Sequence, residues 1–126
     1  MLKIDPPSKP DQISVRKIRE FVFYLKANRG LNVGLLTYDS FASEESIQEA
    51  NNKGVKAERL SVDKDSSQYD LLVDLILRRR IKSYYYAPLK EELMFLEKDK
   101  LRRKVDHCKG NAKDISDSVA GSVWIS

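Results

Sequence analysis

The chain has 126 residues, 41% of them hydrophobic and 33% charged, with a net charge of +4. This balance suits one folded domain over residues 1–126. The single cysteine, Cys108, excludes an internal disulfide, and with only His107 beside it the chain lacks the soft ligands of structural zinc. No apolar run reaches the roughly 20 residues of a membrane span, and no signal peptide is recognisable. We therefore expect a cytoplasmic protein that does not associate with a membrane.

The N-terminal half is expected to alternate helices with short apolar strands. Residues 1–4 suit the tail of a strand, which two prolines end. The apolar residues of the first helix, at helical spacing, are Val15, Ile18, Phe21, Val22 and Leu25. We expect this helix to stop at Gly30, followed by a buried strand over 33–39, a helix over 43–54 and a second strand over 55–63.

The C-terminal half is expected to be mainly helical. A helix over 66–80 should bury Tyr69, Leu72, Val73 and Ile76, and a short edge strand over 81–86 should follow. Pro88 should open a helix over 88–100 with Leu89, Leu93 and Leu96 on one face. Residues 103–107 read as a brief polar segment, and the last helix, 114–126, should bury Ile115, Val119, Val123 and Trp124. The alternation predicts an α/β fold with parallel strand pairs.

Three carboxylates are candidates for chemistry. Asp39 stands where a strand should end, the edge at which open α/β sheets place their functional crevice. Asp114 and Asp117 lie one turn apart at the head of the last helix. If that helix packs beside the strand that ends at Asp39, the carboxylates converge, and such oxygen ligands favour Mg²⁺ or Mn²⁺. Two ions can activate water and stabilise the leaving oxygen of a phosphodiester.

A purely structural interpretation of the same residues stays open. Asp114 suits a helix N-cap, Asp117 interacts favourably with the helix dipole, and Asp39 suits an Asx turn. Asp106, His107 and Lys113 lie before the last helix, where they can meet a phosphate or simply form a solvated loop.

Basic residues cluster in two stretches beside apolar segments, LRRRIK over 77–82 and KDKLRRK over 98–104. Such clusters suit phosphate contacts, although a solvated helix end also favours cations. No glycine-rich phosphate loop is present, so an ATPase or a nicotinamide enzyme is not expected. The candidate DNA contacts are Arg78, Arg79, Arg80, Arg102, Arg103, Lys104 and Lys113.

Several stretches in order resemble the C-terminal nuclease domain of the terminase large subunit of tailed bacteriophages. They are TYDSFAS, IQEANNKG, LSVD, QYDLLVDLILRRRIKSYYY, PLKEELMFLE and, most specifically, KVDHCKGNAKDISDSVAG. The resemblance implies an RNase H-like mixed sheet flanked by helices, and two divalent ions that cut concatemeric double-stranded DNA during genome packaging. It matches Asp39 and Asp117 to the acidic ligands and Asp114 to a metal-proximal position. It also implies the ATPase domain, the small subunit and the portal as partners, in the host cytoplasm.

The chain departs from that family at its N-terminus. The first acidic strand of the family has no counterpart here, so a partial nuclease domain with its first strands missing is expected, active alone only weakly or with another chain supplying the strand. The alternative is a non-catalytic remnant that binds DNA or a packaging partner, self-associating through an exposed sheet edge. A receiver domain phosphorylated on Asp39 ranks last, because the earlier strand lacks an acidic pair.

Overall fold

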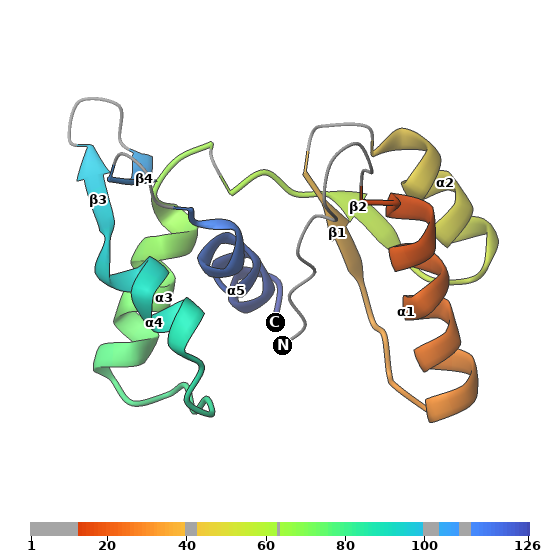
Figure 1. The fold of residues 1–126 in the computed structure, drawn as a ribbon, viewed down its shortest axis with the longest axis horizontal. Helices are drawn as coiled ribbons and strands as arrows, with labels where there is room; N and C mark the ends of the chain where they lie inside the picture. Colours follow the sequence, from red (N-terminus) through yellow and green to blue (C-terminus); the bar gives the residue numbers. More distant parts are fainter. Residues whose placement is uncertain (1–12, 40–42, 63, 100–103, 109–111) are drawn as a thin grey trace. The chain divides into compact units, whose positions relative to one another are not determined.

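The chain forms two compact units, Met1–Leu60 and Ser61–Ser126, each described here by itself. The computed structural model describes residues 13–39, 43–62, 64–99, 104–108 and 112–126 (Figure 1). Its secondary structure is mixed α/β, as the alternation of helical and strand patterns predicts. The prediction of a single domain over residues 1–126 stays a prediction.

The first helix described in this unit is the long α1, Val15–Arg29. Ser14 caps its N-terminus, because the Ser14 hydroxyl oxygen accepts a hydrogen bond from the backbone N–H of Lys17 at 3.3 Å. Gly30 ends the helix with φ at 64°, a left-handed conformation that glycine adopts without steric cost. The predicted helix and its stop signal are confirmed.

A parallel strand pair follows α1. Strand β1, Leu36–Tyr38, pairs with β2, Ala57–Arg59, and helix α2, Glu44–Asn52, connects them. The strands are shorter than the predicted spans, but their order and parallel pairing agree with the prediction. The core of this unit is formed by Ala50, Val55 and Ala57, with Phe23, Val33, Leu36, Tyr38 and Ile47 packed against it.

The buried face of α1 differs from the predicted apolar stripe. Val15 and Phe21 are half exposed, whereas Arg19 is only 4% exposed. Arg19 Nη1 donates to the hydroxyl of Ser46 at 2.7 Å, and the guanidinium forms an ion pair with Glu49; both partners lie on α2. A polar contact therefore joins these two helices where helical spacing alone predicts only apolar packing.

The described residues of the second unit form three helices and an antiparallel strand pair. Helix α3 is Ser67–Leu77, α4 is Ala87–Met94 and α5 is Asp114–Trp124. Strands β3, Leu96–Asp99, and β4, Lys104–His107, pair antiparallel with Leu96 opposite His107. The core joins α3 to α5 through Tyr69, Leu72 and Ala120, with Val62, Ile81, Leu93, Leu96, Val105, Val119 and Val123 packed against it.

Two predictions for this unit are wrong: residues 81–86 are not a strand, and the helix that contains Pro88 ends at Met94. The brief polar segment before the last helix forms strand β4 at residues 104–107. Leu96 belongs to the hairpin, so its helical spacing from Leu93 is coincidental. Two further residues predicted to be buried on α3, Val73 and Ile76, are half exposed, as is Trp124 on α5.

Candidate functional site

Asp39 directly follows β1, as predicted, and its side chain is exposed. The backbone just before it is fixed, because the carbonyl of Tyr38 accepts a hydrogen bond from the N–H of Leu60 at 2.9 Å. Asp39 therefore stands at the carboxyl end of a strand in a parallel pair, where α/β proteins commonly place functional groups. Asp114 and Asp117 belong to the other unit, so their surroundings are described separately.

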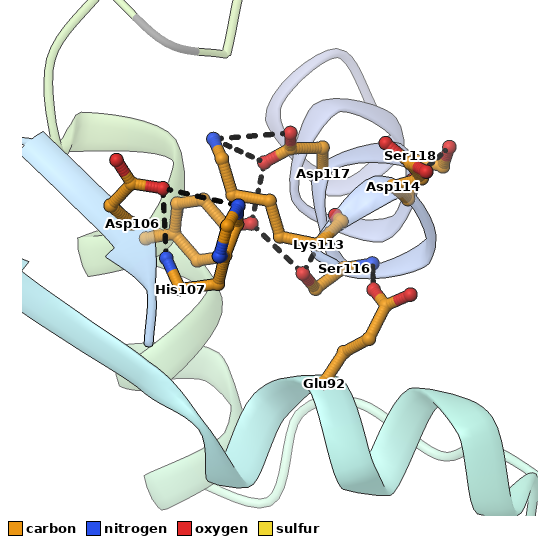
Figure 2. Close-up of polar contacts among 9 residues, drawn as sticks. Glu92, Asp106, His107, Lys113, Asp114, Ser116, Asp117 and Ser118 are labelled. Atoms are coloured by element: carbon orange, nitrogen blue, oxygen red, sulfur yellow. Dashed lines mark hydrogen bonds and ion pairs between the residues drawn. The ribbon is translucent and has the colours of Figure 1, made fainter. Parts of the chain in front are cut away.

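Asp117, on the first turn of α5, accepts hydrogen bonds from two other side chains. The Tyr69 hydroxyl on α3 donates to Asp117 Oδ1 at 2.6 Å. The Lys113 ammonium lies 3.2 Å from Oδ2 and 3.3 Å from Oδ1. Figure 2 shows Lys113 and Asp117 facing each other at the start of the helix. Both side chains are largely shielded from water, which strengthens their ion pair relative to one in bulk solvent.

Ser116 anchors the same helix turn to the rest of the unit. Its backbone N–H, one of those that a helix N-terminus leaves without an intrahelical acceptor, donates to Glu92 Oε2 at 2.7 Å. Its hydroxyl donates to the carbonyl of Lys113 at 2.9 Å and lies 3.1 Å from the Tyr69 hydroxyl. Because Ser116 is fully buried, these contacts fix the position from which Asp117 projects.

Asp106 and His107 lie at the end of β4 and contact each other. The backbone N–H of His107 donates to Asp106 Oδ1 at 2.8 Å and lowers the pKa of Asp106 below its ordinary value. The positive charge of Lys113 also lowers this pKa, so the two residues interact electrostatically. Figure 2 shows the Lys113 ammonium paired with Asp117 and Asp106 bonded to its neighbour His107.

Asp114 is placed differently from the prediction. It is the first residue of α5 rather than its N-cap, a position held by Lys113. Figure 2 shows the Asp114 side chain apart from that of Asp117, near Ser118, whose hydroxyl donates to the Asp114 carbonyl at 2.8 Å. Within the described residues, no three His, Cys, Asp or Glu side chains gather where they could share a metal ion. A site formed by Asp39, Asp114 and Asp117 together stays a prediction.

The basic residues predicted to contact DNA lie in several settings. Arg78, just after α3, forms an ion pair with Asp74 at 2.8 Å, and Arg79 and Arg80 follow on the exposed surface. Lys104 begins β4 and is exposed, whereas Lys113 is engaged with Asp117. Arg102 and Arg103 lie outside the described residues.

The sequence pattern did not indicate the roles of Tyr69, Ser116 and Glu92 in this site. Helical spacing predicts Tyr69 only as a core residue. A buried tyrosine hydroxyl requires a hydrogen-bond partner, however, and this requirement indicates a polar contact at that position. Its acceptor, Asp117, lies 48 residues further along the chain. The thiol of Cys108 donates to Glu97 at 3.0 Å, which raises its pKa and disfavours the nucleophilic thiolate.

No family model, curated protein or solved structure matches this chain. None of the helices that the structure describes has the length and apolar character that a bilayer span requires.

Tyr69→Phe is expected to weaken the dependence of stability on alkaline pH. Burial, followed by the Asp117 carboxylate, raises the pKa of Tyr69 above its ordinary value of 10.0. The folded state thus keeps a proton that the unfolded chain loses. The resulting stabilisation is complete below about pH 10 and is lost as the pH rises further, by up to about 1.4 kcal/mol per pH unit.

Urea unfolding of both proteins between about pH 9 and pH 11 measures this effect. The variant should be less stable at neutral pH by about 1–2 kcal/mol, because Asp117 loses a donor, and its stability should fall less steeply above pH 10. Tyr24→Phe, at an exposed position on α1, is the matched control and should behave like the wild type. Equal alkaline slopes for wild type and Tyr69→Phe would contradict the prediction.

Proposed function

We propose that this chain is a divalent-metal-dependent DNA endonuclease domain of the RNase H-like kind found in phage terminase large subunits. The observation that supports it best is the polar cluster at the head of α5, where Tyr69 and Lys113 hold the Asp117 carboxylate. Lys113 and Asp117 belong to the stretch KVDHCKGNAKDISDSVAG, which carries the most specific part of the resemblance, and Tyr69 belongs to the stretch QYDLLVDLILRRRIKSYYY. The ATPase domain, small subunit and portal are the partners implied.

The donor chemistry of the site suits Mg²⁺ or Mn²⁺ rather than zinc. The acidic candidates offer hard carboxylate oxygens, and the single cysteine keeps its proton through Glu97. In this proposal Asp39 and Asp117 are metal ligands and Asp114 is a ligand or a support for the attacking water. Bound ions would supply Lewis acidity and a water of lowered pKa.

Chain residues provide the remaining functions in this proposal. Tyr69 positions Asp117 by donating its hydroxyl hydrogen to the carboxylate, and Ser116 anchors the helix turn from which Asp117 projects through its backbone N–H bond to Glu92. Lys113 places a positive charge beside the carboxylates, where the phosphate of a DNA strand also needs neutralisation. Arg79 and Arg80, exposed after α3, suit contacts with the backbone that read no sequence.

Supercoiled plasmid DNA incubated with the chain tests the proposal. We expect conversion to nicked and linear forms with Mn²⁺ or Mg²⁺, and no conversion when EDTA replaces the metal. Gel electrophoresis over a time course measures the rates. If a folded chain, verified by circular dichroism, leaves the plasmid intact at millimolar Mn²⁺, the catalytic assignment fails for this chain.

A second candidate function is DNA binding without cleavage, which the exposed basic segment after α3 favours. Under this alternative, DNA binding weakens with rising salt and is unaffected by loss of the carboxylates of Asp39 and Asp117. Electrophoretic mobility shifts of the Asp39→Asn/Asp117→Asn variant separate the two. Binding without metal-dependent cleavage by the wild type would favour the second function over the first.

A further inference from the structure

The segment between α3 and α4 exposes aromatic rings within a run of positive charge (Figure 1, the green loop between the two helices). Residues 78–90 contain five basic side chains and no acidic one. Tyr84 is 59% exposed and Tyr85 77% exposed. Neighbouring large aromatic side chains at the surface of a small unit are unusual and commonly indicate a binding surface.

These tyrosines border an open hollow of about 330 Å³. Leu89, Leu93 and Met94 of α4 line its apolar part, and Lys90 lies beside them. The rings of Tyr84 and Tyr86 stand 6.3 Å apart, tilted by 58°. The hollow therefore offers flat apolar surfaces with positive charge at their margin.

The backbone at the start of this segment is held in an unfavourable conformation. Arg79 has φ at 54°, the only non-glycine residue with positive φ in the part of the chain that the structure describes. Two hydrogen bonds, from Arg79 N–H to Ile76 and from Arg80 N–H to Leu75, form the Schellman ending in which this position normally carries glycine. Such backbone strain at a non-glycine residue often accompanies a functional role, and here it presents the Arg79 side chain.

The positive charge of the segment is largely uncompensated. Arg78 is paired with Asp74. Among the described residues, none of the ion pairs involves Arg79, Arg80, Lys82 or Lys90. Exposed rings among free cations match a polyanion that also presents aromatic faces. They match an apolar protein partner less well, because such a partner would leave the cations around the apolar hollow without counter-charges.

We propose that residues 79–90 bind single-stranded DNA, with Tyr84 and Tyr85 stacking on bases and Arg79, Arg80, Lys82 and Lys90 contacting phosphates. The inference rests on the proposed function for its choice of DNA. It adds a base-stacking surface that favours unpaired strands, since the base faces of a duplex are already stacked and inaccessible. Such a surface would hold a strand opened near a cleavage site.

Fluorescence anisotropy of a labelled thymidine oligonucleotide of about 20 nucleotides tests this inference. The measurement is made in EDTA, so binding is read without cleavage. Tyr84→Ala and Tyr85→Ala should each weaken binding at least about fivefold, whereas Tyr84→Phe and Tyr85→Phe, which keep the ring, should stay within about twofold of wild type. Both side chains are exposed, so these variants leave the core intact.

Salt dependence separates stacking from charge. Arg79→Gly should lower the slope of log affinity against log salt by about 0.7, the loss of one phosphate contact on a single strand. The melting temperature of this variant should be unchanged or higher, because glycine relieves the positive φ. Weaker binding by a protein at least as stable cannot be attributed to misfolding. The two alanine variants should keep the wild-type slope.

Three results would overturn the inference. One is unchanged oligonucleotide affinity in the Tyr84→Ala/Tyr85→Ala variant. Another is equal affinity of the wild type for a duplex of the same length. The third is an altered oligomeric state of the Tyr84→Ala/Tyr85→Ala variant, measured by sedimentation, while its DNA binding is unchanged. That result would assign the hollow to contact between copies of the chain. A wild type that cuts no plasmid but shows the expected binding pattern would refute the proposed nuclease and leave this surface standing.

Discussion

Asp117→Asn should reduce Mn²⁺-dependent plasmid nicking at least about 100-fold. A bound metal stabilises transition-state charge by several kcal/mol, and each 1.36 kcal/mol corresponds to about a tenfold change in rate. The substitution removes the charge that a metal ligand needs while keeping the shape of the side chain. Asparagine Oδ1 can still accept from the Tyr69 hydroxyl, so the start of α5 should keep its position.

Glu91→Gln is the matched control for this measurement. Glu91 is exposed on α4 in the same unit, and its substitution removes the same charge. We expect its nicking rate to stay within about twofold of wild type, because a surface charge of this kind contributes little. Comparable losses in both variants would indicate an effect of net charge on DNA binding, and the assignment of Asp117 as a ligand would fail.

Tyr69→Phe provides an intermediate case in the same assay. Residues that orient a metal ligand commonly contribute 10–100-fold to affinity or activity. A positioning role for Tyr69 predicts a loss of about this size that higher Mn²⁺ concentration partly rescues, whereas a purely structural role predicts no metal dependence. Wild-type activity of Tyr69→Phe at every Mn²⁺ concentration would refute the positioning role of Tyr69. The role of Asp117 as a ligand is tested by Asp117→Asn.

Asp39→Ala examines the other unit independently. In the proposed function Asp39 is also a ligand, so nicking should disappear as it does for Asp117→Asn. Glu58→Gln, at an exposed position on β2, is its control. If Asp39→Ala cuts at the wild-type rate while Asp117→Asn does not, the ligand set derives from the second unit alone.

Local signals made much of the first unit predictable. Gly30 and Gly54 both adopt positive φ, as their predicted roles in ending helices require. The strands around α2 are short, and a helix between two such strands leaves parallel pairing as the natural connection. These features depend on residues that lie close together in the sequence, and the pattern therefore determines them.

The hairpin of the second unit depends on contacts that the sequence pattern does not reveal. Leu93 and Leu96 fit a helical spacing, but Leu96 pairs opposite His107 and packs against the core of α3 and α5. Strand β4 has one apolar residue, Val105, among polar ones, too weak a pattern to identify a strand. Tertiary packing decides the structure at such positions.

The positions of the acidic residues of the candidate site could be predicted from the sequence, but their hydrogen-bond partners could not. The location of Asp39 after a strand and of Asp117 in the first turn of a helix follows from local pattern. The hydrogen bonds of Asp117 with Tyr69, and of Ser116 with Glu92, join elements distant in sequence. Whether Asp39 and Asp117 act together stays a prediction, which the paired variants above examine.

Arg19→Ala should destabilise the first unit by about 2 kcal/mol. Breaking a buried ion pair from one side commonly costs 3–5 kcal/mol, because the remaining charge is left without a partner. Glu49 is 31% exposed, so water reaches the remaining carboxylate and places the expected cost below that range. The hydroxyl of Ser46, which is buried, also loses its donor.

Urea unfolding, together with hydrogen exchange of the amides of α1 and α2, measures this loss. Arg16→Ala is the matched control, since Arg16 lies on the same helix in an exposed ion pair with Glu20 at 3.4 Å and should contribute less than about 0.5 kcal/mol. Arg19→Met/Glu49→Met should recover most of the stability, because apolar side chains of similar volume can replace a buried pair. An Arg19→Ala protein as stable as Arg16→Ala would show that the guanidinium is incidental to the packing of α1 on α2.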